Sequence, residues 1–297
     1  MANLKEVRER IVSVSSTQQI TKAMKMVSAA KLRRAQNAIT QMRPYAIKLG
    51  QILSNVMESA GSDSDIALGA KRDVVHPLIV VVTSNRGLCG AFNTNIIKAA
   101  IATIEGKYRS QYEAGHLHLM CIGKKAADFL TKRYPKATFH NDDVEIFNDL
   151  RYERVYEIAE QMLHSFVEGE VDVIHVAYGR FRNAAMQFAE IVPFAPIAPP
   201  SHESDSPTGP RADYIYEPGQ EELLEDLIPM IMKTQFFRFL LDTHASEHGA
   251  RMTAMDKATE NAEDLKKELK ITYNKARQEA ITRELSEIVG GAAALGG

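Results

Sequence analysis

Cysteine is scarce in this chain of 297 residues, where only Cys89 and Cys121 are present. Two cysteines cannot build the disulfide framework of a small secreted domain, and this usage is typical of a reducing compartment. No stretch approaches the roughly 18–20 apolar residues that a membrane-spanning helix needs. The N-terminus has no apolar signal core, and Glu6 and Glu9 argue against a transit peptide. The sequence therefore predicts a soluble, cytosolic-side protein with no membrane span.

Acidic residues are absent from one long segment. No Asp or Glu stands between Arg10 and Met57, and residues 1–50 carry ten Lys and Arg against two Glu, a net charge of +8. The excess is local, because the whole chain has a formal net charge of −2. A one-sided basic segment favours an acidic partner, which could be nucleic acid, anionic lipid or an acidic protein surface. Composition alone leaves these three open.

Glycine and proline are missing from both ends of the chain. Residues 1–43 contain neither, the first break is Pro44, and the stretch 250–289 is equally free of both. Asn3 followed by Glu6 resembles a capping box. At about 1.5 Å per residue, the first helix would extend about 60 Å. A compact chain of this length has a radius of gyration of only about 19 Å. Both ends are therefore predicted to be long helices that project or are enclosed by a partner.

The spacing of apolar residues predicts an antiparallel coiled coil between the two ends. At the C-terminal end the predicted seam is rich in alanine and runs through Met255, Ala258, Ala262, Leu265, Leu269, Thr272 and Ala276. At the N-terminal end it runs through Leu4, Val7, Ile11 and Val14, and it resumes at Leu32, Ala35, Ile39 and Met42.

Between residues 18 and 31 the N-terminal seam loses its apolar character. One interpretation is a stutter that alters the supercoil locally. The other is that residues 18–31 face a second partner as well as their own helix. The sequence leaves both interpretations open. The seam positions here are Gln18, Thr21, Lys25 and Ser28, whereas the apolar residues are Ile20, Met24 and Val27.

The middle of the chain has the alternation of an α/β domain. Residues 78–83 form a continuous β-branched run typical of a buried parallel strand. This order implies βαβ units and a Rossmann-like sheet of mainly parallel strands. Further strands are predicted at 116–123 and 171–181, an edge strand at 186–194, and helices from about Thr94, at 124–134 and at 151–168.

The predicted fold class is therefore α/β plus coiled coil, with the α/β domain inserted between the two long helices. Pro229 is expected to kink or restart the second helix. The expected segments are an N-terminal coiled-coil helix at 1–60, the α/β domain at 75–198, an irregular crossing segment at 199–219 and a C-terminal coiled-coil helix at 220–297.

The loop 84–93 invites comparison with nucleotide-binding loops because it follows a predicted strand and precedes a helix. It contains neither G-x-G-x-x-G nor G-x-x-x-x-G-K-[ST], so the backbone cradle for phosphate is incomplete. A tight turn is favoured instead, in which Gly87 and Gly90 supply unusual backbone angles. Cys89 has no histidine nearby in the sequence to activate it, and we expect it to be a buried small apolar residue.

His244, Glu247 and His248 match H-x-x-E-H, one of the zinc-protease signatures. Two histidines four residues apart share a helix face. A catalytic zinc also needs a third ligand and an open position in a cleft, whereas this motif opens a coiled-coil helix. We therefore expect no metal, no nucleotide, no cofactor and no catalytic residue in this chain.

The basic N-terminal helix carries no interleaved aromatic residues and no nucleic-acid recognition motif. Both absences count against nucleic acid, but composition alone does not choose between nucleic acid and an acidic protein surface. A coiled-coil adaptor or nucleic-acid tether with an α/β head remains the rival hypothesis, and it predicts self-association and salt-sensitive binding. An enzyme that uses the loop 84–93 is the third and weakest hypothesis.

Three strings narrow these alternatives. They are VSVSSTQQITKAMKMVSAAKLRR at 12–34, TSNRGLCGAFNTN at 83–95, and the stretch 245–295, which begins ASEHGARMTAMDKATENAEDL and ends TYNKARQEAITRELSEIVGGAAAL. In order and spacing they resemble the γ subunits of bacterial-type rotary F-type ATP synthases over nearly the whole chain. Gly290 departs from the serine usual at that position of the family. No cysteine-bearing insert of the chloroplast type is present.

The resemblance implies a central-stalk rotor. In that family the paired helices thread the cavity of three α and three β subunits. The α/β domain, with the ε subunit, stands on the membrane-embedded c-ring at the cytoplasmic face of the cell membrane. Proton flow turns the ring and shaft, and the shaft drives each β site through its states, so the chemistry belongs to β. The resemblance therefore implies a peripheral, non-catalytic subunit.

The resemblance also implies contact residues, because the acid-free helix would face acidic segments of β. For Met24 and Thr282 the alternative is packing within the coil, and Lys275 and Glu279 are expected to be solvated. The implied contacts with β or α are Lys22, Met24, Lys25, Arg86, Arg277, Gln278, Thr282 and Glu284.

Overall fold

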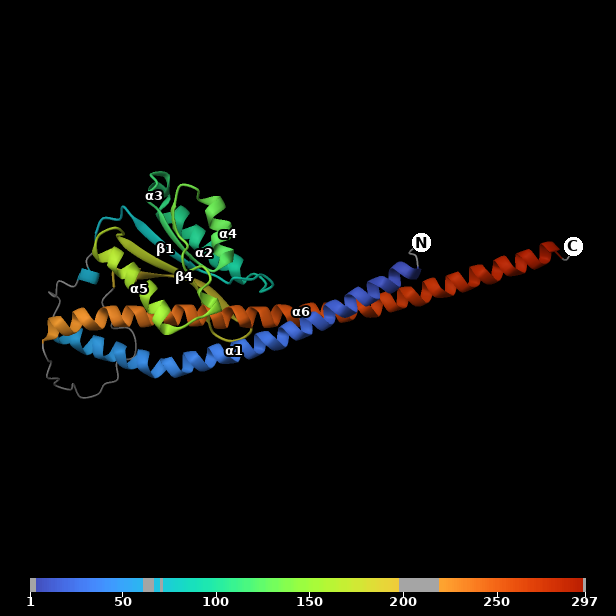
Figure 1. Ribbon diagram of the computed structural model, residues 1–297, viewed down its shortest axis with the longest axis horizontal. Coiled ribbons are helices and arrows are strands. Elements are labelled where there is room, and N and C mark those ends of the chain that lie inside the picture. Colours follow the sequence, from blue (N-terminus) through green and yellow to red (C-terminus); the bar gives the residue numbers. More distant parts are fainter. Residues whose placement is uncertain (1–3, 61–66, 70–71, 198–218, 296–297) are drawn as a thin grey trace. The chain divides into compact units, whose positions relative to one another are not determined.

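The computed structural model describes residues 4–60, 67–69, 72–197 and 219–295 (Figure 1). The chain forms two compact units, which we call the coil unit (residues 1–29 with 251–297) and the sheet unit (residues 30–250). Helices α1 (Leu4–Ala60) and α6 (Gln220–Leu295) contribute to both units. The expected cap at Asn3 and the irregular segment at 199–218 lie outside the described residues.

The sheet unit contains a five-stranded sheet in the order β3-β2-β1-β4-β5. Strands β1 (Pro77–Val82), β2 (His118–Ile122), β3 (Thr138–His140) and β4 (Val173–Phe181) are parallel, and β5 (Gln187–Ala195) is antiparallel to β4. The parallel strands and the edge strand predicted from the sequence are confirmed. Strand β3 was not predicted, because a pattern of period 2 needs more than three residues to show.

Helices cover both faces of this sheet (Figure 1). Along β1, Ile79 and Val81 face α2 (Phe92–Lys107) and α4 (Lys124–Arg133), whereas Val80 and Val82 face α5 (Tyr152–Val167) and the first part of α6. Strand residues alternate between faces, so an unbroken β-branched run is expected where both faces are covered. Short helical elements complete the unit: η1 (Ala67–Gly69), α3 (Arg109–Glu113) and η2 (Ile146–Asn148).

The first part of α6 belongs to the core of the sheet unit. Ile228, Met232 and Phe236 have no exposed surface and pack into the same core as α5. They stand four residues apart, on one face of the helix. The unit boundaries at 29/30 and 250/251 therefore differ from the expected segment boundaries at 60 and 220, because both long helices enter the sheet unit.

Neither proline ends its helix. Pro44 lies inside α1 and Pro229 inside α6, so α6 does not restart at Pro229. A proline in a helix interior costs about 3 kcal/mol because it removes a backbone donor and its ring meets the preceding turn. Burial of Ile228 and Met232 on either side of Pro229, at about 1.5–3 kcal/mol for each side chain, offsets that cost.

The coil unit pairs α1 and α6 in antiparallel directions, as predicted. Thr21 is joined to Thr259 across the two helices, Lys25 to Asp256 and Ser15 to Lys266. As the residue number rises along α1, the number of its partner falls along α6.

The seam of α6 differs from the predicted one at two positions. Leu265 is 46% exposed and Thr272 is exposed as well, although both were predicted to be seam residues. The other five predicted seam residues are buried or half-buried: Met255, Ala258, Ala262, Leu269 and Ala276. Between them, and also half-buried, come Thr259, Lys266, Tyr273 and Ala280.

One buried carboxyl in α6 makes the stability of the sheet unit depend on pH. Asp242 is buried, and this burial raises its pKa to about 6, against the effect of nearby Arg238, Arg180 and Arg43. An acid whose folded-state pKa is raised keeps its proton more tightly when folded. Stability therefore falls as the pH rises from about 4 to about 6. Above that window the ionised carboxylate lowers the free energy of unfolding by about 3 kcal/mol, because each unit of pKa difference corresponds to about 1.4 kcal/mol.

We therefore expect Asp242→Asn to be more stable than the parent chain at pH 7.5 and nearly equal to it at pH 4. Urea unfolding at both pH values measures the difference. Asp226→Asn is the matched control, because Asp226 is exposed on the same helix. Equal effects of Asp242→Asn at the two pH values would contradict the prediction.

Candidate partner-contact surfaces

Polar side chains join the two helices of the coil unit where large apolar residues are missing from the seam. The Thr259 hydroxyl lies 2.8 Å from the Thr21 hydroxyl. Lys266 Nζ donates to Ser15 Oγ at 3.1 Å and to Gln18 Oε1 at 3.5 Å. Polar pairs at seam positions add little stability, but they fix the register of a coiled coil because a slip leaves their groups unpaired.

The seam of α1 keeps its phase through residues 18–31. Thr21 and Ser28 are buried, and Gln18 and Lys25 are half-buried. Ser28 donates its hydroxyl to the Met24 carbonyl of its own helix at 2.8 Å, so its burial leaves no polar group unpaired. The stutter interpretation is therefore wrong, because small and polar side chains occupy the seam here without any shift of phase.

Apolar side chains of α1 face away from this seam. Val12, Ile20, Met26 and Val27 are each 58–60% exposed. Scattered exposed apolar residues are ordinary, but these lie within about four turns of one helix whose seam is polar. A row of this kind is a candidate surface for another chain.

The C-terminal end of α6 extends beyond its partner helix. Leu4 and Ala280 are half-buried, whereas every residue from 281 to 292 is exposed. The pairing of Lys25 with Asp256, continued along both helices, places Leu4 near Arg277. Within the described part of the chain, α6 is thus unpaired beyond about residue 280.

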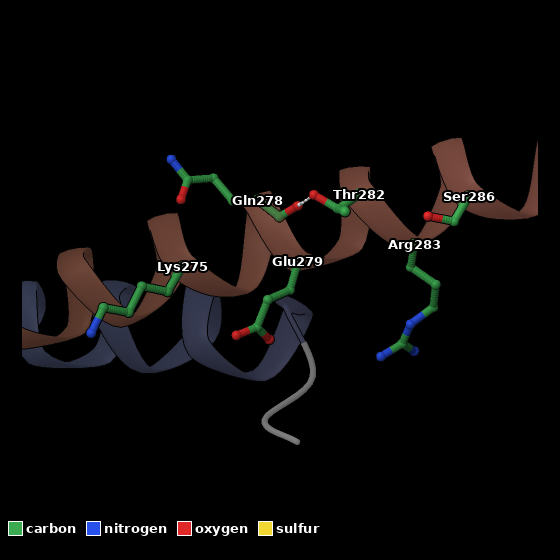
Figure 2. Close-up of a pocket in the computed structure, with 6 residues that line it drawn as sticks. All are labelled: Lys275, Gln278, Glu279, Thr282, Arg283 and Ser286. Atoms are coloured by element: carbon green, nitrogen blue, oxygen red, sulfur yellow. Dashed lines mark hydrogen bonds between the residues drawn. The ribbon is translucent and has the colours of Figure 1, made fainter.

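A shallow groove runs along this end of α6 (Figure 2). Figure 2 shows two rows of side chains: Lys275, Glu279 and Arg283 project to one side, and Gln278, Thr282 and Ser286 form the adjacent row. Residues four apart form ridges on a helix, and the space between two ridges accepts a ridge of a partner. One row is charged and the other is neutral and polar, so the groove offers hydrogen bonds and charge but no nucleophile with a base.

The candidate contacts on α1 lie in the coil unit with different degrees of burial. Lys22 is exposed and Met24 is half-buried. Lys25 is half-buried, and its Nζ lies 2.5 Å from Asp256 Oδ1. An ion pair this exposed contributes only about 0–1 kcal/mol. Lys25 therefore helps to pair the two helices, whether or not it also contacts another subunit.

The candidate contacts on α6 form a second cluster. Arg277, Gln278, Thr282 and Glu284 are exposed. The Thr282 hydroxyl donates to the Gln278 carbonyl at 2.9 Å, so packing within the coil does not explain Thr282. The structure does not bring this cluster close to the cluster on α1. Lys25 of the α1 cluster pairs with Asp256 of α6. Asp256 is 22 residues from Gln278, which is about 33 Å along the helix.

The candidate Arg86 belongs to the sheet unit, in the loop between β1 and α2. Its side chain is exposed, and its carbonyl accepts a hydrogen bond from the Ser84 hydroxyl at 2.7 Å. Asn93 Oδ1 accepts the backbone N–H of Ser84 at 2.9 Å, and Asn93 Nδ2 donates to Ser84 Oγ at 2.8 Å. Hydrogen bonds therefore join the start of the loop that carries Arg86, next to β1, to Asn93 in α2.

The turn predicted for this loop is present, and one of its two predicted unusual backbone angles is confirmed at Gly90. Leu88 has a φ of 66° and Gly90 a φ of 60°, whereas Gly87 stays outside the left-handed region. Leu88 is 65% exposed. Cys89 is buried, as predicted, and packs in the core beneath α2.

The H-x-x-E-H motif is enclosed in the sheet unit and does not line a cleft. His248 and Glu247 are buried, and Nε2 of His248 lies 3.0 Å from Nε2 of His244. Phe147 stacks on His244 with 5.7 Å between ring centroids. Between the two histidines, the Ser246 hydroxyl donates to the Gly179 carbonyl at 3.0 Å, which anchors α6 to β4.

Among the described residues, none of the helices has the length and apolar composition that a membrane span requires. No group of three or more His, Cys, Asp and Glu side chains in the ranges that the structure describes is arranged to hold a metal ion.

Sequence comparison decides the family. A family model described as ATP synthase matches residues 3–295. The ATP synthase gamma chain of Flavobacterium johnsoniae is 51% identical over 298 residues, covering 100% of both chains. That of Cytophaga hutchinsonii is 50% identical over 295 residues, covering 99% of each. The chain belongs to the ATP synthase gamma chain family.

The fold agrees with this assignment. A chain in a structure of the Euglena gracilis mitochondrial ATP synthase, comprising OSCP, F1 and the c-ring in rotational state 3, superposes with a TM-score of 0.65. It is 24% identical and covers 98% of this chain and 94% of its own. A chain from the central stalk and c-ring of the Tetrahymena thermophila enzyme gives a TM-score of 0.57 at 20% identity, covering 80% and 99%.

Gamma chains are non-catalytic subunits of the ATP synthase and form the rotor of its F1 part. This chain is accordingly the central-stalk subunit, associated with other ATP synthase subunits. The catalytic chemistry of the complex therefore lies in other subunits.

Sequence reasoning missed two features of these surfaces. Arg283 and Ser286 complete the groove on α6 but were not among the candidates. The spacing of Gln278, Thr282 and Ser286 at four-residue intervals could have identified the row. The polar seam was visible in the sequence only as a gap in the apolar pattern.

Proposed function

We propose that the coil unit transmits torque between a membrane-embedded c-ring and the catalytic β subunits. In this way proton flow is coupled to ATP synthesis or hydrolysis. Three α and three β subunits surround the coil, and the ε subunit and the c-ring bind the sheet unit. The assembly lies at the cytoplasmic face of the cell membrane, with this chain as a peripheral subunit.

The observation that carries this proposal is the reversal of polarity in residues 18–28 of α1. Thr21 and Ser28 are buried in the seam, while Ile20 and Val27 are 60% and 58% exposed. A coil that served only to join its own helices would bury the apolar residues instead. The polar seam fixes the register of the two helices, and the apolar and basic exterior is available to surrounding subunits.

Two levels of the coil are proposed to contact β or α. The first comprises Lys22, Met24 and Lys25. The second, about 33 Å along α6, comprises Arg277, Gln278, Thr282 and Glu284. Arg86, held in its tied loop, is proposed to supply a contact from the sheet unit. Contacts at two positions along the coil favour torque transmission. A coil held at a single position could tilt within the surrounding subunits without rotating against them.

The second level can be tested with the double variant Arg277→Ala and Gln278→Ala. Hydrogen bonds to a charged group contribute about 1.5–3 kcal/mol, so we expect ATP-driven proton pumping to fall roughly tenfold. Thermal unfolding of the isolated chain should be unchanged, because both side chains are exposed. Pumping is measured in vesicles reconstituted with the whole enzyme.

Lys270→Ala is the matched control, since Lys270 is exposed on the same helix about two turns earlier. Normal pumping by the double variant would show that these residues do not make the proposed contact. Affinity purification with subunit counting tests the assembly itself. One copy of this chain with three α and three β is the expected result, and self-association without α and β would contradict the proposal.

A further inference from the structure

Four of the nine histidines gather on one face of the sheet, over β1, β2 and β3, apart from every surface described above. They are His76 before β1, His116 before β2, His118 in β2 and His140 at the end of β3. The ring centroids of His76 and His116 are 4.6 Å apart, those of His76 and His118 are 5.9 Å apart, and those of His118 and His140 are 5.5 Å apart.

The strand register explains why these rings meet. Leu78 lies opposite His118 in the β1–β2 pair, which puts His76 next to His116. Met120 lies opposite His140 in the β2–β3 pair, which puts His118 and His140 on a diagonal. Residues two apart on a strand share a face, so all four side chains stand on the same face of the sheet.

His118 and His140 have the geometry of two ligands of one metal ion. Nδ1 of His118 lies 3.2 Å from Nε2 of His140. A tetrahedral zinc with bonds of about 2.0–2.1 Å holds neighbouring nitrogens about 3.3 Å apart. The two rings are nearly parallel, with 13° between their planes, and His140 is exposed, so an ion can reach the pair from solvent.

We propose that His118 and His140 bind a divalent transition-metal ion of the zinc class. Imidazole nitrogen suits zinc, copper and nickel, whereas calcium and magnesium prefer oxygen ligands. Water completes the coordination, because no third His, Cys, Asp or Glu among the described residues stands in a ligand position. Bound metal ties the three-residue edge strand β3 to β2 and stabilises this edge of the sheet.

The rival explanation is a simple hydrogen bond in which one ring donates to the other. That bond also gives a separation near 3.2 Å. It predicts no metal affinity, whereas the proposed site predicts one ion per chain.

The test is isothermal titration calorimetry of the full, untagged chain with zinc chloride, which measures the number of zinc ions bound and their affinity. We expect one zinc per chain, and His140→Gln should weaken binding at least about tenfold, since loss of even an outer-shell partner costs about 10–100-fold. His140 is exposed, so this variant should fold, and its zinc-free melting temperature verifies that. Zinc should raise the melting temperature of the parent chain but not that of the variant. Calcium chloride should do neither.

Two control variants locate the site. His164→Gln alters an exposed histidine on α5 and should leave zinc binding unchanged. His244→Gln alters the other close histidine pair and should also leave it unchanged. Absence of zinc binding, binding that survives His140→Gln, or binding that is lost in His244→Gln would each overturn the proposal.

Discussion

Gly123→Ala is expected to destabilise the sheet unit by about 2–6 kcal/mol. Gly123 has a φ of 101°, and a Cβ built on it would lie 2.1 Å from the Thr83 carbonyl oxygen. A disfavoured backbone region costs about 1–3 kcal/mol, and forced overpacking typically costs as much again. The obstacle is backbone, so no side-chain rotation removes it.

The neighbouring strands cannot easily move away from Gly123. The Thr83 N–H donates to the Ile122 carbonyl at 2.7 Å, and the Gly123 N–H donates to the Val144 carbonyl at 2.9 Å. Thr83 Oγ1 also accepts the Ala126 N–H at 2.9 Å, at the start of α4. A shift at Thr83 would therefore disturb two strands and one helix.

Urea unfolding measures the effect of Gly123→Ala, and Gly106→Ala is the control. Gly106 lies in α2 with nothing within 4 Å of an added Cβ. Alanine favours a helix over glycine by about 1 kcal/mol, so this control should be neutral or slightly stabilising. A loss below about 1 kcal/mol in Gly123→Ala would show that the loop relaxes freely, which this geometry excludes.

Met24→Lys is expected to reduce coupling far more than stability. Met24 is half-buried on α1, one residue from Lys25 and two from Lys22. A third cation here would attract carboxylates of a surface that the coil is proposed to slide past. A new ion pair that holds one rotational position slows release from that position. The isolated chain should lose little stability, because exposed charges contribute only about 0–1 kcal/mol.

The measurement for Met24→Lys is proton pumping per ATP hydrolysed in vesicles reconstituted with the whole enzyme. Gln41→Lys is the control, since Gln41 is exposed on the same helix about five turns further along, outside the coil unit. Normal pumping per ATP in Met24→Lys, or equal uncoupling by both variants, would refute the placement of Met24 at the contact.

The sequence predicted those elements whose pattern is long and regular. Strand β1 is recognisable as a buried β-branched run, and α6 as a stretch without helix breakers. The seam of α6 was predicted at five of seven positions, and the prediction failed at Leu265 because an apolar rule selects Leu265 where the structure uses Lys266. Lys266 occupies the seam because it finds Ser15 and Gln18 on the facing helix. That pairing depends on the register, which no single helix encodes.

The candidate contacts were predictable as a set but not as a geometry. Motifs selected Gln278 and Thr282, and the structure adds that both line one groove with Ser286. They could not show that Lys25 bonds to Asp256, or that its level lies far along the helix from Gln278. The distance between the two contact clusters is known only once α1 is aligned with α6. That alignment depends on contacts between the two helices, which neither helix reveals by its own sequence.

The polar seam of the coil unit also bears on the fate of the chain before assembly. A seam of Thr21, Ser28 and Ala262 buries little apolar surface, so the two helices hold each other weakly compared with the core of the sheet unit. In a newly made chain without partners they would separate often and expose backbone to proteases. Enclosure by neighbouring subunits would remove that exposure. Orphan copies would then be degraded while assembled ones persist, which matches the number of stalks to the number of complete enzymes.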